Sequence, residues 1–161
     1  MSDVPGETDP PAIQLGDRVT PAEYRSLLAA VNWRPLEQDD IAVAAALEVS
    51  WNVTSRTSDG SLVGLARVLD DGLLYASIWD VIVRPERQRA GIGRALLTAV
   101  LEQTAGRRLV SLVSTAAGEA LYRSAGFGET DGRSTALFRR APEAEQLPVM
   151  EWPSPDAGGE E

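Results

Sequence analysis

An apolar run followed closely by a turn with two glycines constrains this chain more than any other feature. The run is Ile78-Trp79-Asp80-Val81-Ile82-Val83, and the turn is Gln88-Arg89-Ala90-Gly91-Ile92-Gly93-Arg94. Apolar residues then recur at helical spacing over 92–103, so the pattern predicts a buried strand, a glycine loop and an amphipathic helix. Glycine lets a ligand approach the backbone closely, and the free N–H groups of a helix start bind anions. The turn therefore predicts a site for a phosphorylated ligand.

The composition excludes several kinds of chemistry, because the chain has no Cys and no His and all 15 basic residues are Arg. Without Cys there is no disulfide and no thiolate nucleophile, and without His there is no imidazole catalyst. The absence of Lys excludes a Walker-A phosphate loop and a Schiff-base mechanism. We predict no metal site, and any proton transfer must use a carboxylate, a tyrosine, the chain terminus or water.

The net charge of −9 belongs to the two ends of the chain. Nine acidic residues and no Arg fall within 1–12 and 142–161, whereas 13–141 contains 15 Arg and 15 acidic residues. We predict a disordered acidic tail over 1–12, one folded domain over 13–141 and an acidic extension over 142–161. The apolar piece 147–152 has no assigned role. A central domain without a broad basic face is not expected to bind nucleic acid.

Turn signals divide the central domain into alternating elements. Asp59-Gly60 and Asp71-Gly72 are hairpin markers, and Pro21 after Thr20 is a favourable helix start. Helices are expected from residue 21 and over 38–49, 92–103 and 116–125; strands are expected over 13–19, 51–57, 61–69, 73–83, 109–113 and 135–140. This order predicts an α/β fold with a mixed sheet, in which 73–83 is a central strand covered on both faces.

The glycine loop alone leaves several interpretations open. Arg84, Arg87, Arg89 and Arg94 surround it, and only Glu86 opposes them. Positive charge at a helix N-terminus opposes the helix dipole and favours a bound anion, although a solvated basic face is an alternative. A dinucleotide fingerprint is not expected, because Leu96 stands where its third glycine is required.

Two motifs together resemble the GNAT superfamily of N-acetyltransferases. Gln88-x-x-Gly91-x-Gly93 after an apolar strand resembles the acetyl-CoA motif of that superfamily, and Ala120-Leu121-Tyr122-Arg123-Ser124-Ala125-Gly126-Phe127 resembles its second motif. The resemblance covers about 13–140. It implies a three-layer α/β/α fold whose mixed, mostly antiparallel sheet is splayed between its central strands. It also implies acetyl-CoA as cosubstrate.

The resemblance implies a set of cofactor contacts. Backbone groups of Val81, Ile82 and Val83 would bind the pantetheine arm as an added strand does, and the N–H groups of 89–94 would hold the pyrophosphate. The N–H of Val81 would polarise the thioester carbonyl and stabilise the oxyanion that forms from it. Thr115 stands where the family often has Asn, and it is the candidate for a further pantetheine contact.

The resemblance also suggests catalytic roles. Tyr122 is the candidate general acid for the departing thiolate, and a core tyrosine is the alternative. Asp80 is the one charged residue in the apolar run, and a buried carboxylate is costly unless it is paired or used. It is therefore either the base that deprotonates the acceptor or the partner of an Arg on the neighbouring strand, most simply Arg67. Ser77 is a candidate for holding water nearby.

The acceptor is predicted to be a primary amine, attacked directly in a ternary complex because no good nucleophile is present to carry the acetyl group. A small cationic amine is favoured, with Trp33 and Trp51 as weak candidates for its site. A protein or peptide amine, a non-catalytic acyl-CoA-binding module and a GNAT-fold toxin acting on aminoacyl-tRNA are the alternatives. No membrane span or signal peptide is found, so a cytoplasmic protein is expected, with a homodimer as one oligomeric state to test.

Overall fold

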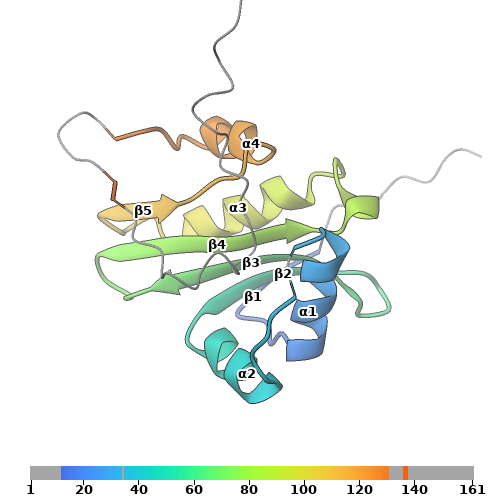
Figure 1. Cartoon of the computed structure of the whole chain (residues 1–161). Coiled ribbons are helices and arrows are strands. Elements are labelled where there is room, and N and C mark those ends of the chain that lie inside the picture. Colours follow the sequence, from blue (N-terminus) through green and yellow to red (C-terminus); the bar gives the residue numbers. More distant parts are fainter. Residues whose placement is uncertain (1–11, 34, 131–135, 138–161) are drawn as a thin grey trace, which may run out of the picture.

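The computed structural model of the protein describes residues 12–33, 35–130 and 136–137, and its elements follow the predicted order (Figure 1). The helices are α1 (Pro21–Ala30), α2 (Asp40–Glu48), α3 (Ile92–Gln103) and α4 (Glu119–Ser124), with a short 3-10 helix, η1 (Pro85–Arg87), before α3. The strands are β1 (Ile13–Leu15), β2 (Trp51–Arg56), β3 (Leu62–Asp70), β4 (Tyr75–Val83) and β5 (Leu109–Leu112).

The strands form one mixed sheet in the order β1-β2-β3-β4-β5. Neighbours from β1 to β4 are antiparallel, whereas β5 runs parallel to β4. Figure 1 shows α1 and α2 on one side of this sheet and α3 and α4 on the other. The predicted three-layer α/β fold with a mixed, mostly antiparallel sheet is therefore confirmed.

Each face of the sheet has its own apolar core. The α3 face buries side chains of β2, β3, β4 and α3, including Val53, Leu96 and Val100. The α1 face buries side chains of α1, α2 and the adjoining strands, including Leu27 and Leu65. Gly64 on β3 lets α3 approach closely, since a Cβ built there would lie 2.8 Å from Cγ2 of Ile92. The predicted coverage of β4 on both faces follows from these two cores.

Local capping explains where the first helices begin. Thr20 caps α1 in a capping box with Glu23, and Pro21 occupies the first helical position. Asp39 caps α2 through the N–H of Ala42, so this helix begins at Asp40 rather than at the predicted residue 38. Both helices therefore begin where a side chain replaces the missing backbone acceptor.

Several predicted boundaries are wrong for identifiable reasons. The first strand ends at Leu15 instead of 19, because Gly16 turns the chain with a φ of +66°. β4 begins at Tyr75 instead of 73, because the Asp71 carboxylate accepts the N–H groups of residues 73–75 and closes a turn. The helix predicted from 116 begins at Glu119. The strand predicted over 135–140 and the two predicted tails lie largely outside the described residues.

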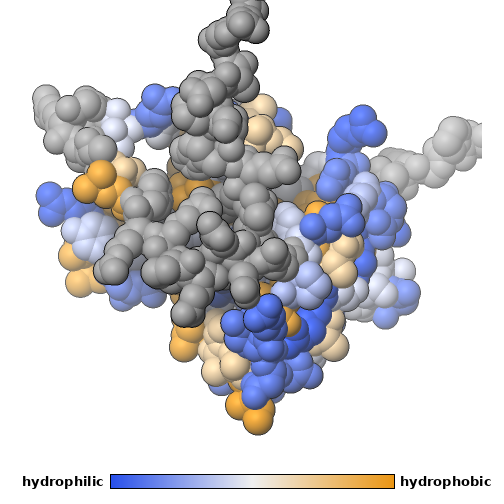
Figure 2. Space-filling view, viewed as in Figure 1, coloured by the Kyte–Doolittle hydropathy of each residue, from blue (hydrophilic) through white to orange (hydrophobic). Residues whose placement is uncertain are grey.

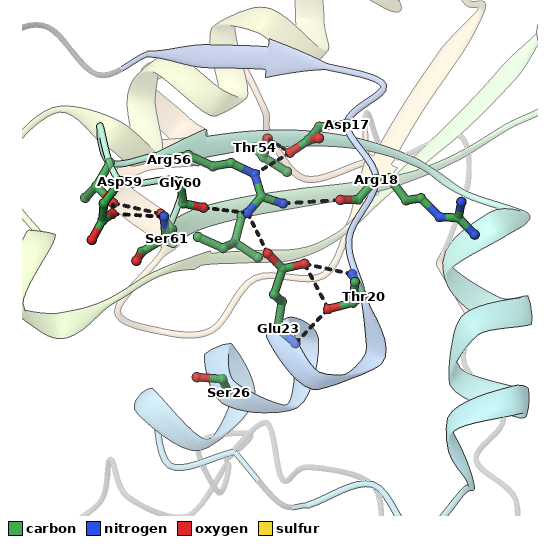
Figure 3. Close-up of polar contacts among 12 residues, drawn as sticks. Asp17, Arg18, Thr20, Glu23, Ser26, Thr54, Arg56, Asp59, Gly60 and Ser61 are labelled. Carbon is green, nitrogen blue, oxygen red and sulfur yellow. Dashed lines mark hydrogen bonds and ion pairs between the residues drawn. The ribbon is translucent and has the colours of Figure 1, made fainter.

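A half-buried arginine on β2 fixes the segment between β1 and α1 (Figure 3). Nε of Arg56 lies 2.7 Å from the Asp17 carboxylate, and its Nη1 lies 2.6 Å from that of Glu23. The same guanidinium donates to the carbonyl oxygens of Arg18 and Gly60. Burial raises the pKa of both carboxyl groups, but the hydrogen bonds and charge of Arg56 outweigh it and leave both pKa values lowered.

This network predicts a loss of stability in acid. A carboxyl whose pKa is lowered on folding stabilises the protein above its unfolded pKa of about 4, and the stabilisation is lost as the pH falls through the folded value. We expect Arg56→Gln to lower the free energy of unfolding by about 2–3 kcal/mol at pH 7 and by less at pH 3. Urea denaturation at both pH values measures this difference.

Arg18→Gln is the matched control, because the Arg18 side chain is 90% exposed and lies 3.9 Å from Glu48. Its effect should stay within about 0.5 kcal/mol at either pH. An Arg56→Gln variant that loses as much stability as the wild type between pH 7 and pH 3 would contradict the assignment.

Exposed apolar side chains gather where β5 begins and the β3–β4 hairpin turns, toward the left of Figure 2. The members of this cluster are Leu69, Leu73, Leu74, Tyr75 and Leu109.

Within the described part of the chain, no helix is long and apolar enough to cross a membrane.

Candidate active site

The interior strand β4 contains a bulge at Asp80 and Val81. Arg67 pairs with Trp79 and Leu65 pairs with Ile82, so one β3 residue opposes two residues of β4. Asp80 has a φ of +52°, in the left-handed region that non-glycine residues rarely adopt. Such bulges bend a strand and redirect its groups, and strained residues of this kind cluster at functional sites.

Beyond the bulge, one edge of β4 is open. The last pair between β4 and β5 joins Ile78 to Leu112, so residues 79–83 have no strand partner on that side among the described residues. We call this stretch the open edge. The pairing matches the splay between central strands that the sequence resemblance implies.

The hydrogen-bond pattern shows which groups face the open edge. The N–H of Arg84 donates to the Val63 carbonyl at 2.9 Å and therefore points toward β3. N–H groups alternate between the two edges of a strand, so Ile82 also points toward β3. The N–H group of Val83 then points to the open edge, where an extended ligand can pair with it, and Val81 lies within the bulge at the start of this edge.

The glycine loop ends beside the open edge and leaves several N–H groups free. Arg89 and Gly91 have φ values of +63° and +83°, and Gly91 caps α3 without a side-chain hydrogen bond. Within the described residues, no backbone acceptor pairs with the N–H groups of residues 89–94. Left-handed residues next to a helix start form a concave set of N–H groups that binds anions.

The side chains around this loop are not all available to an anion. Arg84 is not, because its Nε donates to the Leu62 carbonyl and its Nη2 donates to Ser26 Oγ at 2.7 Å. The prediction that four arginines surround the loop is therefore wrong for this residue. Arg87, Arg89 and Arg94 are exposed. The Gln88 side chain turns back and donates to the Val83 carbonyl at 3.1 Å.

Tyr122 lies on a helix that contacts the glycine loop. A Cβ built at Gly93 would lie 3.5 Å from Leu121 and 3.8 Å from Val83, so α3, α4 and β4 converge there. The Tyr122 ring is half-buried and packs edge-on against Phe127 with 6.2 Å between ring centroids. Burial raises the pKa of the Tyr122 hydroxyl, which therefore keeps its proton at neutral pH.

Asp80 lies at the centre of a polar cluster under α1. Nε of Arg67 donates to its Oδ2 at 2.7 Å, and the Tyr24 hydroxyl donates to the same oxygen at 2.8 Å. The ion pair with Arg67, one of the two predicted alternatives, is present. It does not exclude the other alternative, because both donors use Oδ2, and no hydrogen bond within the described residues uses Oδ1.

The remaining candidate residues are divided between the two faces of the sheet. Trp33 packs against the core of the α1 face, whereas Trp51 packs against the core of the α3 face, so the structure does not bring them together. Ser77 lies two residues before Trp79 on β4 and therefore shares its face. Thr115 Oγ1 accepts the N–H of Gly118 at 3.2 Å, close to the Tyr122 ring.

Sequence reasoning missed three residues of the α1 face. The helical spacing of apolar residues places Tyr24 in the apolar stripe of α1. The sequence gives no sign that Asn52 differs from an ordinary strand residue. Trp79 reads as core. Asn52 Oδ1 and Trp79 Nε1 are nevertheless buried without a hydrogen-bond partner in the described structure. Because Thr54, Ser55 and Arg56 make β2 polar along most of its length, the sequence did not distinguish Asn52 from its neighbours.

The fold and the site together define a class of protein. A mixed sheet with an open edge on its central strand, next to a glycine loop at the start of a helix, is the arrangement implied by the resemblance to N-acetyltransferases. The sequence profile of the acetyltransferase (GNAT) domain matches residues 51–129, which include both motifs.

Known proteins show the same similarity. The chloroplastic GCN5-related N-acetyltransferase 1 of Arabidopsis thaliana is 32% identical over 73% of this chain and 61% of its own length. The N-acetyltransferase ycf52 of Porphyra purpurea, described as uncharacterized, is 28% identical over 65% of this chain and 63% of its own. A GNAT-family acetyltransferase structure from Streptococcus pneumoniae TIGR4 is 27% identical with a TM-score of 0.68, covering 82% of this chain and 98% of that one.

The chain belongs to the GNAT superfamily of N-acetyltransferases. Members of this superfamily are acyltransferases that generally use acetyl-CoA. The chain spans between 38% and 63% of the length of the curated relatives it matches.

Proposed function

We propose that this chain transfers the acetyl group of acetyl-CoA to a primary amine by direct attack in a ternary complex. The observation that carries the proposal is the open edge of β4 ending at a ring of free N–H groups over residues 89–94. An extended pantetheine arm fits the open edge, and a diphosphate fits the ring. The two features lie in the order that coenzyme A requires.

In the proposed reaction the amine attacks the thioester carbonyl carbon, and the carbon–sulfur bond breaks after a tetrahedral intermediate. The N–H of Val81 would stabilise the oxyanion, since Val81 lies in the bulge where the open edge begins. Tyr122 would donate its proton to the departing thiolate, and because burial raises the pKa of its hydroxyl, the proton is present at neutral pH. Thr115 would contact the pantetheine arm.

Asp80 would hold the acceptor ammonium and receive its proton, directly or through a water near Ser77. Arg67 and Tyr24 occupy only Oδ2, which leaves Oδ1 for the amine. A small cationic acceptor is favoured because the carboxylate lies within a domain that has no excess of Arg. Trp33, on the same face, is a candidate wall for this acceptor.

Release of free thiol from acetyl-CoA, measured over a panel of amines, tests the proposal. We expect release to depend on the amine and to be faster with small primary amines than with protein lysines or peptide N-termini. Thiol release with none of the amines, despite binding of coenzyme A, would contradict the transferase proposal and favour a non-catalytic acyl-CoA-binding module. A cytoplasmic location stays a prediction, and some relatives are named chloroplastic.

Tyr24 is proposed as a positioning residue for Asp80. Burial, and then the negative charge of Asp80, raise the pKa of Tyr24, so its hydroxyl remains a donor across the working pH range. Tyr24→Phe should lower kcat/KM for the amine about 10- to 100-fold, because Asp80 loses one of two groups that orient it. The KM for acetyl-CoA should not change. Steady-state kinetics with each substrate varied separately measures both values.

Tyr75→Phe is the matched control, because Tyr75 is half-exposed at the other end of β4 and is assigned no role. Its kinetic constants should equal those of the wild type. Equal kcat/KM for the amine in wild type and Tyr24→Phe would show that the hydrogen bond is only structural.

A further inference from the structure

The outward side of α2 is apolar, although a helix at the surface of a protein normally carries polar residues there. Val43 and Leu47 face the protein and are buried in the core of the α1 face. On the opposite side, Ile41 is 82% exposed, and Val49 at the end of the helix is 75% exposed. Figure 2 shows apolar surface at the lower end of the molecule, where α2 lies in Figure 1. The helix therefore exposes apolar side chains where water favours charged ones.

Alanines fill the rest of this outward side. Ala45 lies one helical turn from both Ile41 and Val49, and the three adjoin because residues four apart on a helix are neighbours. Ala42 and Ala46 beside them are also exposed. We call these five residues the outer α2 surface. A continuous exposed apolar patch marks an interaction site, whereas single exposed apolar residues need no explanation.

The outer α2 surface is complementary to itself, because it has a small residue at its centre and larger residues at both ends. Two copies of α2 can cross in opposite directions about a two-fold axis at Ala45. Ile41 of each copy then lies against Val49 of the other, as a symmetric interface requires. The small side chain of Ala45 lets the helix axes approach to about 8 Å, the short end of the range for packed helices.

The charges at the two ends of α2 favour the same arrangement. At the C-terminal end, Nη2 of the exposed Arg18 lies 3.9 Å from the Glu48 carboxylate. At the N-terminal end, the side chain of Asp40 is 73% exposed. In the antiparallel arrangement, Arg18 of one copy lies near Asp40 of the other, and the opposite ends of the two helix dipoles lie side by side. Such exposed charges at the edge of an interface set its orientation and contribute little affinity.

We infer that the outer α2 surface is a self-association site, on which a second copy of this chain packs its own α2 in the antiparallel direction. The helix has nine residues and is therefore about 14 Å long. One such helix covers less than the roughly 800 Å² that a stable interface buries on each partner. The dimer is therefore weak, and its population depends on protein concentration. Nothing in the proposed acetyl transfer is needed for this contact.

Sedimentation velocity of the full chain between about 5 and about 500 µM measures the association, because the fraction of dimer follows mass action. We expect a monomer–dimer equilibrium within this range. Ala45→Glu should raise the dissociation constant at least about 100-fold, because two like charges would face each other at the two-fold axis. Ala105→Glu is the matched control, since Ala105 is exposed beyond the end of α3, on the other side of the sheet (Figure 1). Its dissociation constant should equal that of the wild type.

Cross-linking tests the direction of the two helices. The chain has no Cys, so an introduced thiol can form a disulfide only with another introduced thiol. Ala45→Cys should give a disulfide-linked dimer under mild oxidation, because the two-fold axis brings the two Cα atoms within disulfide range. Ile41→Cys and Val49→Cys should each cross-link poorly alone and efficiently when the two variants are mixed. Ala105→Cys is the control and should stay uncross-linked.

Three outcomes would overturn this inference. A wild-type chain that is monomeric at every concentration has no such dimer, and association that persists in Ala45→Glu uses another surface. A monomer that Ala45→Glu destabilises far more than Ala105→Glu does, measured by urea denaturation, would show that another part of the same chain covers the outer α2 surface. Cross-linking of Ile41→Cys alone, as efficient as in the mixture with Val49→Cys, would contradict the antiparallel arrangement.

Discussion

Replacing Gly91 with Glu should abolish measurable coenzyme A binding while the chain stays folded. Gly91 has a φ of +83° and caps α3, and no atom lies within 4 Å of a Cβ built there. The Cβ of the new side chain would meet no protein atom, and its carboxylate would bring a negative charge to the ring of N–H groups proposed to bind the diphosphate. Repulsion between like charges costs several kcal/mol, so the affinity should fall by at least about 100-fold.

Gly72→Glu is the matched control for this variant. Gly72 also has a positive φ, of +77°, and open space around it, but it lies in the β3–β4 turn. Both variants should lose about 1–2 kcal/mol of stability from left-handed backbone strain. Titration calorimetry should then show wild-type affinity for coenzyme A in Gly72→Glu and none in Gly91→Glu. Similar affinities for coenzyme A in the two variants would show that the loop does not bind the diphosphate.

Tyr122→Phe should slow turnover by roughly 10- to 1000-fold with little change in the KM for acetyl-CoA. Phenylalanine keeps the edge-on contact with Phe127, so only the hydroxyl is lost. Burial raises the pKa of Tyr122 from its ordinary value of 10.0, so the wild-type hydroxyl should remain an acid up to at least pH 10. A kcat–pH profile of the wild type should therefore show no loss from Tyr122 ionisation below that pH.

Two further measurements make the Tyr122 prediction specific. The thermal stability of Tyr122→Phe should stay close to that of the wild type, since the hydroxyl has no hydrogen-bond partner among the described residues. Tyr75→Phe again serves as a matched change at an exposed position. Wild-type turnover in Tyr122→Phe would show that Tyr122 has a purely structural role.

Much of the fold could be predicted because its signals are local. The capping residue of α1, the Asp71-Gly72 turn and the helical spacing after Gly93 each act over a few neighbouring residues. The order of elements follows from these signals, and so does the glycine loop. Boundaries were less accurate where a turn or a capping contact ends an element before its pattern ends. The first strand is an example, because the positive φ of Gly16 turns the chain and Asp17 then binds Arg56 on β2.

The details of the site depend on contacts that local patterns do not contain. The bulge at Asp80 depends on how the residues of β3 and β4 pair with one another. The apolar run would have the same sequence pattern with or without the bulge. Tyr24 lies 56 positions from Asp80, so its hydrogen bond depends on how α1 packs. Arg67 was predictable as a partner because it lies on the adjacent strand and Asp80 was the one charge in its run.

The account depends most on the ring of N–H groups over residues 89–94. Titration calorimetry with coenzyme A and, separately, with pantetheine tests it directly, because pantetheine lacks the diphosphate. We expect clear binding of coenzyme A and affinity at least about 100-fold weaker for pantetheine, as expected if the loop binds phosphate oxygens. No heat with millimolar coenzyme A, or equal affinity for the two compounds, would contradict the central claim.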